Sequence, residues 1–86
     1  MDRKAVIGGV LADLERSAYA MGAEWRHGHE IAQANEGDRL FDRLHALLHR
    51  IEGDEWNAGY WYRRAGTTPF PGSFAEEVEA LRAALR

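Results

Sequence analysis

The sequence predicts an all-α fold of about five helices, packed as an orthogonal or antiparallel bundle in a single domain over residues 1–86. Apolar residues recur at helical spacing in several segments, and residues that start or stop helices separate those segments. A further indication is the pair Gly53-Asp54, because glycine suits the left-handed position after one helix and aspartate suits the start of the next. We therefore expect a helical hairpin at the centre of the fold.

The segment before this turn has the clearest apolar face. Asp38 is expected to cap the helix, and its apolar residues then fall on one side, as in an amphipathic helix that faces a core. This face consists of Leu40, Phe41, Leu44, Leu47, Leu48 and Ile51. The same reasoning predicts a first helix over residues 1–21, which Asp2 caps, and a second over residues 23–34.

Two further helices are expected after the turn. The fourth covers residues 54–65, and the prolines and glycine of residues 67–72 then predict a loop. Ser73 and Glu76 have the spacing of a capping box, which indicates the start of the last helix. The apolar face of that helix contains Phe74, Val78, Leu81 and Leu85.

A polar stripe borders the apolar face of the helix over residues 38–51. It consists of Asp38, His45, His49 and Glu52, whose spacings place them on neighbouring turns. Two imidazoles four residues apart can share a metal ion, and Glu52 could supply an oxygen, with His29 or Glu30 as a further ligand. The alternatives are histidines that bond neighbouring side chains at the core edge, or an acid–base role without metal. No cofactor is expected unless the metal alternative holds.

A small-ligand or catalytic pocket is a second hypothesis for the same stripe. Trp25 lies one helical turn before His29, which would set an apolar wall beside a titratable ring. His45 or His49 could then act as general base, with Glu52 orienting it and Arg63 holding an anionic group. The candidate residues are Trp25, His29, His45, His49, Glu52, Tyr60 and Arg63. Whether the protein is an enzyme stays open, although the pattern favours a binding role.

The helix over residues 54–65 carries aromatic residues on more than one side. Ala58, Trp61, Tyr62 and Ala65 project one way. Trp56, Tyr60 and Arg63 project nearly opposite. A helix that is apolar all round is either enclosed by its own chain or covered by another. The favoured hypothesis is a module that binds a protein partner or a second copy through Trp56, Tyr60 and Arg63, with Tyr19 as a further interface candidate.

Two resemblances involve these residues. The series Gly53-Asp54, Ala58, Tyr62, Ala65 and Pro69 resembles the second half of a tetratricopeptide-type hairpin, although only one such unit is present and histidines replace apolar residues in its first helix. Residues 45–66 are similar to the signature HAxLHRxEGDxxNAxYWYRRAG of a group of small proteins without an assigned activity. This second resemblance implies only that the polar and aromatic residues are used together.

Composition narrows the classes of function. The net charge is −3 and charges of both signs are mixed, which argues against a nucleic-acid partner that would require a basic stripe. No segment approaches the length of apolar sequence that a membrane span needs. The absence of cysteine fits a cytoplasmic location. A core of 86 residues is close to the lower limit of stability, so a homo-oligomer is also expected.

Overall fold

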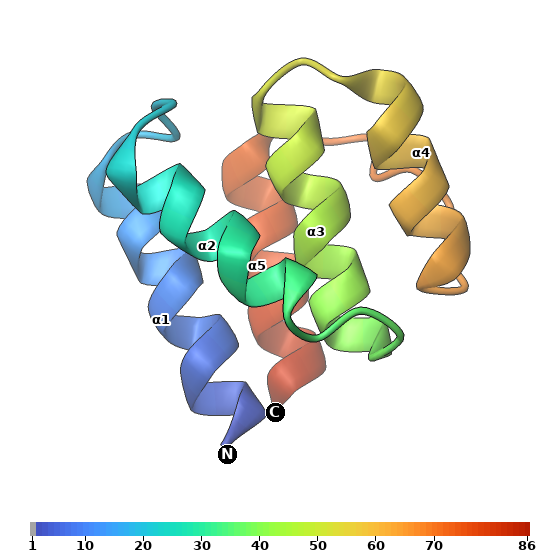
Figure 1. Ribbon diagram of the computed structural model, residues 1–86, viewed down its shortest axis with the longest axis horizontal. Helices are drawn as coiled ribbons and strands as arrows, with labels where there is room; N and C mark the ends of the chain where they lie inside the picture. Colours follow the sequence, from blue (N-terminus) through green and yellow to red (C-terminus); the bar gives the residue numbers. More distant parts are fainter. Residues whose placement is uncertain (1) are drawn as a thin grey trace.

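The structure, a computed structural model, describes residues 2–86 and consists of five helices without a strand in that range. The helices are α1 (Arg3–Arg16), α2 (Ala23–Gln33), α3 (Arg39–Ile51), α4 (Glu55–Arg64) and α5 (Phe74–Leu85). Figure 1 shows that α1 and α3 run in one direction and α2 and α4 in the other. The predicted all-α class and the central hairpin of α3 and α4 are confirmed.

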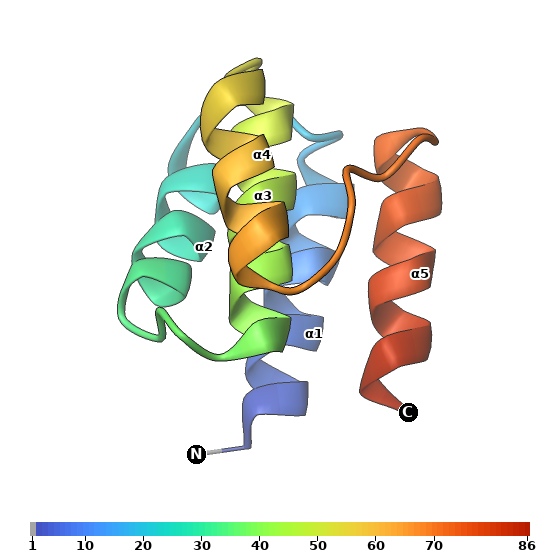
Figure 2. The same cartoon turned by 90° about the vertical axis from the view of Figure 1, so that its right-hand side faces the viewer.

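Helix α3 is the central element of the fold. It packs against all four other helices, and its contact with α4 is the most extensive in the chain. The connection after α4 returns along the side of the molecule, so that α5 runs in the same direction as α4 (Figure 2). The centre of the apolar face predicted for α3 is buried, since Leu44, Leu47 and Leu48 have no exposed surface, while Leu40 and Ile51 at its ends are partly buried. A central helix enclosed in this way can place polar side chains where water has little access.

The corner between α3 and α4 forms as predicted. Gly53 has a φ of +85°, the left-handed conformation that glycine adopts without steric cost. The amide of Asp54 donates to the carbonyl of His49 at 2.9 Å, and the amide of Gly53 donates to the carbonyl of Arg50 at 3.1 Å. These two bonds define a Schellman motif, which satisfies carbonyls left free at the end of α3. Asp54 then caps α4 by accepting from the amide of Asn57.

The first helix is shorter than its apolar pattern predicts. It ends at Arg16, and the same pair of bonds closes it: the amide of Tyr19 donates to Leu14, and that of Ala18 to Glu15. Ala18 and Tyr19 adopt positive φ values of 54° and 59°, an ending that no glycine announces in the sequence. The early turn lets the Tyr19 ring pack edge-on against Phe74, with centroids 5.6 Å apart. Met21, the last residue of the predicted helix, lies outside α1 and is 52% exposed, and Met1 lies outside the described residues.

A closed polar network ties α3, α4 and α5 together. The carboxylate of Glu77 has no exposed surface and accepts from Arg50 Nη1 at 2.8 Å and from the Tyr62 hydroxyl at 2.6 Å. Arg50 also donates to the carbonyl of Gly72. Burial and the adjacent Glu77 carboxylate raise the pKa of Tyr62 well above its usual value. Every charged group of this network therefore has a partner.

None of the helices within residues 2–86 is both long enough and apolar enough to cross a lipid bilayer.

Candidate functional site: a cluster of three histidines

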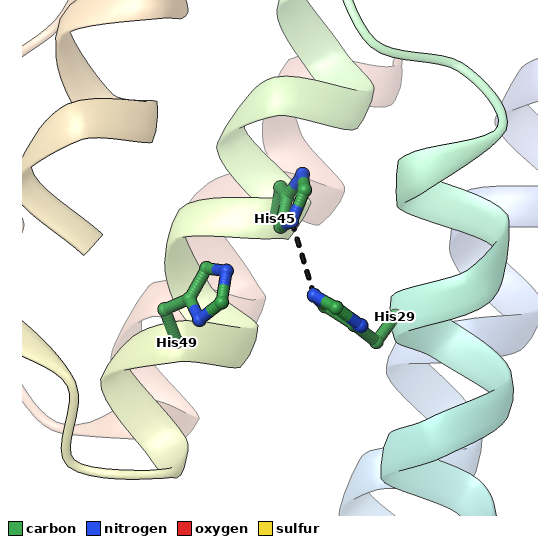
Figure 3. A group of neighbouring side chains, drawn as sticks. All are labelled: His29, His45 and His49. Carbon is green, nitrogen blue, oxygen red and sulfur yellow. Dashed lines mark hydrogen bonds between the residues drawn. The ribbon is translucent and has the colours of Figure 1, made fainter. Parts of the chain in front are cut away.

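Three of the four histidines converge on one point between α2 and α3. His45 and His49 lie one turn apart on α3, and His29 reaches them from α2 (Figure 3). The Nε2 atoms of His29 and His45 are 3.2 Å apart, which is a hydrogen bond in which one ring donates and the other accepts. One ring nitrogen from each histidine lies within 4.8 Å of those of the other two. The cluster is therefore compact enough for three nitrogens to contact a single atom.

Two tryptophans form the walls of this cluster, which we call the imidazole cluster (His29, His45 and His49). Trp25 stacks on His29 with ring centroids 4.8 Å apart, and Trp61 stacks on His45 at 3.9 Å. The indole nitrogen of Trp25 donates to the carbonyl of Leu48 at 2.8 Å, so this wall is itself anchored to α3. These flat rings restrict the rotation of His29 and His45, whose Nε2 atoms bond each other.

The close approach of α2 depends on Gly28. A Cβ atom at this position would lie 2.8 Å from Val10 Cγ1 and 3.6 Å from Leu48 Cδ2. The first distance is shorter than a van der Waals contact, and valine has little freedom to move away. Gly28, which interrupts the helical pattern in the sequence, thus lets the next residue, His29, come within reach of His45.

Burial lowers the pKa of two of these imidazoles, those of His45 and His29. His45 is 2% exposed, and burial, together with the nearby His29 and His49, lowers its pKa from the usual 6.5 to about 3. Burial also lowers the pKa of His29, an effect reinforced by His49 and partly offset by Glu52. Neutral imidazole is the form that donates a lone pair to a metal ion.

Glu52 holds the ring of His49 from the outside. The Nδ1 atom of His49 and Oε1 of Glu52 are 2.5 Å apart, and the side chain of Glu52 is 28% exposed. Together with Asp54, these two residues make a second compact group of potential ligands that shares His49 with the imidazole cluster. A carboxylate in this position fixes the ring orientation and the tautomer of the histidine.

The distances fit a small cation of the transition series. Zinc binds imidazole nitrogen at about 2.0–2.1 Å, so two ligands at tetrahedral angles lie about 3.3 Å apart. The separation of 3.2 Å between the Nε2 atoms of His29 and His45 already matches this value. A metal ion could therefore take the place of the proton that these two nitrogens share, with modest movement of His49.

Only part of the predicted candidate set lies at this point. Trp25, His29, His45, His49 and Glu52 come together, as described above. Asp38, from the same predicted stripe, instead caps α3 and accepts from Arg3 at 2.6 Å.

The candidates on α4 lie further out. Tyr60 packs edge-on against Trp61, with ring centroids 5.0 Å apart, and Trp61 in turn contacts His45. Arg63 is exposed, and Trp56 is 76% exposed and lies 6.4 Å from Tyr60, centroid to centroid. These residues form an outer surface of α4 instead of the rim of a pocket. The remaining interface candidate, Tyr19, follows α1 and is half-buried against Phe74, the first residue of α5.

Two neighbours of the cluster were not singled out as site residues from sequence. Trp61, which the sequence places on one side of its helix with Ala58 and Tyr62, forms one wall of the imidazole cluster. Asp42 is 1% exposed, and its spacing of three residues before His45 could have placed it on the polar stripe.

Fold and cluster together define a small all-α protein, with five helices in residues 2–86, in which three histidines meet between two tryptophan walls. No protein family model matches the chain, and no curated protein or solved structure matches it either.

Proposed function

We propose that this protein binds a divalent transition metal ion, Zn²⁺ being the best fit, through His29, His45 and His49. The observation that carries the proposal is the convergence of three imidazole nitrogens within 4.8 Å in a site where burial disfavours protonation. Imidazole nitrogen is a preferred ligand of zinc, nickel and copper. Three protein ligands would leave the fourth position to a water molecule or to a group from a ligand.

In this proposal Glu52 orients a ligand instead of binding the metal itself. Its carboxylate already bonds Nδ1 of His49, which leaves the other ring nitrogen for the ion. The ligand set thus differs from the sequence-based alternative of His45, His49 and Glu52, because His29 supplies the third contact.

We expect the metal to serve binding or stability and not a reaction on a large substrate. The structure contains a cavity of about 320 Å³, but residues other than the histidines line it, among them Arg50, Glu55, Tyr62 and Phe70. Both indole walls cover the imidazole cluster closely, with stacking distances of 4.8 Å and 3.9 Å. We therefore expect any ligand besides the ion to be small, such as a water molecule.

Zinc uptake tests the proposal directly. Chelator-treated protein is titrated with Zn²⁺ against a competing chromophoric chelator, and tryptophan emission is recorded because Trp25 and Trp61 contact the ligand rings. We expect one ion per chain, and loss of binding in His29→Gln, His45→Gln and His49→Gln. His27→Gln is the matched control, since His27 lies on the same helix as His29 but is exposed. Equal loss in the control, or no uptake by the wild-type protein, would contradict the proposal.

Self-association is a second candidate function, which the exposure of Trp56 favours. A tryptophan that is 76% exposed and stacks loosely on Tyr60 is a large apolar surface beside an exposed arginine, Arg63. Tryptophan, tyrosine and arginine are enriched at the centres of protein interfaces. We propose that a second copy of the chain covers this surface.

Light scattering after size-exclusion chromatography tests self-association over a series of protein concentrations. A dimer is expected for the wild-type chain and a monomer for Trp56→Ser. A wild-type chain that stays monomeric at every concentration would exclude it.

A cytoplasmic location is compatible with both candidate functions, because a chain without cysteine forms no disulfide that would require an oxidising compartment. Fractionation of the source cells would check this expectation.

A further inference from the structure

Asp42 is a buried carboxylate on α3 with half of its hydrogen-bonding capacity unused. The residue is 1% exposed, and Oδ1 accepts from the amide of Gly37 at 3.2 Å. The other oxygen, Oδ2, is buried and has no hydrogen-bond partner within residues 2–86. An unsatisfied buried oxygen of this kind is destabilising, so its presence calls for an explanation.

The atom that would complement this oxygen lies one turn further along the same helix. Within residues 2–86, three buried side-chain atoms lack a partner: Asp42 Oδ2, Arg43 Nε and His45 Nδ1. Adjacent residues on a helix point apart, whereas residues three apart face the same side. Asp42 and His45 are therefore the matching pair, an acceptor and a nitrogen that becomes a donor when it carries the ring proton.

Metal binding determines where that proton lies. A neutral imidazole has one N–H, so an ion on Nε2 of His45 leaves the proton on Nδ1. Nε2 is the atom of His45 that faces His29, at 3.2 Å, and is thus the one presented to the ion. The buried Nδ1–H then needs an acceptor, and histidine ligands in metal sites commonly donate this proton to a carboxylate.

We propose that Asp42 is the positioning residue of His45 in the metal-bound protein, accepting the hydrogen bond of His45 Nδ1–H directly or through one buried water molecule. This inference rests on the proposed zinc site. It gives the cluster two carboxylates with parallel tasks, Glu52 for His49 from the solvent side and Asp42 for His45 from the interior. A role in the α2–α3 connection alone would account for Oδ1 and leave Oδ2 unexplained.

The substitution Asp42→Asn distinguishes the proposed bond to His45 from the bond to the Gly37 amide. The amide oxygen can still accept from Gly37, but its NH₂ group then occupies the position of Oδ2 and presents a donor to the donor on His45. Turning the amide over places its NH₂ against the Gly37 amide instead, so neither orientation satisfies both. We expect the variant to fold without metal. Its zinc dissociation constant should rise about 10- to 100-fold, the range typical when a group that hydrogen-bonds a metal ligand is removed.

The matched control is Asp13→Asn, which removes a carboxylate on α1 whose bonded partner is Arg16 of the same helix. Zinc affinity should not change in this variant. A wild-type protein that binds zinc while Asp42→Asn binds it equally well would overturn the role of Asp42 and leave the zinc site standing. A wild-type protein that takes up no zinc would overturn both.

A measurement on the wild-type chain keeps the inference testable if Asp42→Asn fails to fold. Long-range ¹H–¹⁵N correlation spectra of the histidine rings report which nitrogen carries the proton. In the zinc-loaded protein we expect His45 to carry it on Nδ1, with slow exchange against solvent. A zinc-loaded His45 without a proton on Nδ1, or one whose Nδ1–H exchanges freely, would refute the inference.

Discussion

Two buried polar clusters border α3, and they are built in opposite ways. The network of Arg50, Glu77 and Tyr62 is closed, because each oxygen of the Glu77 carboxylate has a donor at 2.6–2.8 Å. In the imidazole cluster the only carboxylate bonded to a ring within residues 2–86 is Glu52, whose side chain is 28% exposed, and in the same range Nδ1 of His45 has no hydrogen-bond partner. The first cluster has no capacity left for a ligand. The second keeps lone pairs available, which is what a metal ion requires.

The energetic consequence of this difference is that the two clusters respond differently to mutation. Removal of one partner from a buried ion pair leaves an uncompensated charge, which is strongly destabilising. Replacement of a buried neutral group by an apolar group of similar shape costs little where water can reach the partner left behind, as it can at the half-buried His29. The closed network should therefore be needed for folding, and the imidazole cluster for binding.

The largest effect on binding is expected from His45→Phe. Phenylalanine keeps a flat ring against Trp61 but supplies no ligand, so zinc uptake should disappear in the chelator competition assay. The metal-free variant should unfold within about 1 kcal/mol of wild type, because a buried polar ring is replaced by an apolar one of similar shape. Zinc binding of wild-type strength in this variant would show that His45 is no ligand.

The opposite pattern is expected from Glu77→Ala. Arg50 and the Tyr62 hydroxyl lose their shared acceptor, and the free energy of unfolding should fall by about 3 kcal/mol in urea denaturation. The folded fraction should bind zinc with unchanged affinity. Glu79→Ala serves as the control, since Glu79 is an exposed residue of the same helix. A small loss, equal to that of the control, would mean that the network is dispensable.

The pH dependence of the metal-free protein sharpens the comparison further. His45 has its pKa lowered from 6.5 to about 3, so the unfolded chain binds more protons than the folded chain between these values. Stability is then greatest above pH 6.5 and falls as the pH decreases. Between pH 7 and pH 5 the loss should be roughly 1 to 2 kcal/mol, and His45→Phe should lose less. Melting temperatures of both proteins, measured in chelator over this pH range, would test the prediction. An equal fall in melting temperature with pH for the two proteins would argue against a buried neutral His45.

The smallest effect is expected from Glu52→Gln. The amide oxygen can still accept from His49, and the side chain it replaces is 28% exposed, so water can compensate. We expect zinc affinity to fall by less than about tenfold, below the effect of Asp42→Asn, and stability to change by less than about 0.5 kcal/mol. A larger loss of affinity than for Asp42→Asn would instead indicate that Glu52 binds the metal directly.

Several features of the fold could be predicted from local chemistry. Gly53 and Asp54 specify the corner between α3 and α4, and Ser73 and Glu76 form the capping box expected at the start of α5. The helical spacing of His45 and His49 also fixed their common flank on α3. The resemblance of residues 45–66 to a group of small proteins and the tetratricopeptide-like packing stay predictions.

Other features depend on contacts between distant segments. After α1, Ala18 adopts a left-handed conformation. Glycine usually marks such a helix end, and the sequence has none at this position, so the end could not be predicted. Glu77, on the last helix, is fully buried and accepts hydrogen bonds from Arg50 and Tyr62. Helical spacing places Glu77 beside the apolar face, three residues after Phe74, whereas the exposed Glu76 and Glu79 lie on the other side. Spacing within the helix does not indicate its two partners, which come from distant segments.

The sequence by itself determined the helices, their caps, the hairpin and the flank of α3 that carries two imidazoles, because hydrogen bonds and side-chain spacing within a few residues govern these features. Only the tertiary structure decided that His29 joins them, since that contact requires α2 to cross α1 and α3 at Gly28. It also decided that Trp61 covers the cluster while Trp56 faces solvent. The physical reason is that burial and the meeting of side chains from different helices follow from the packing of the whole chain, which no single segment encodes.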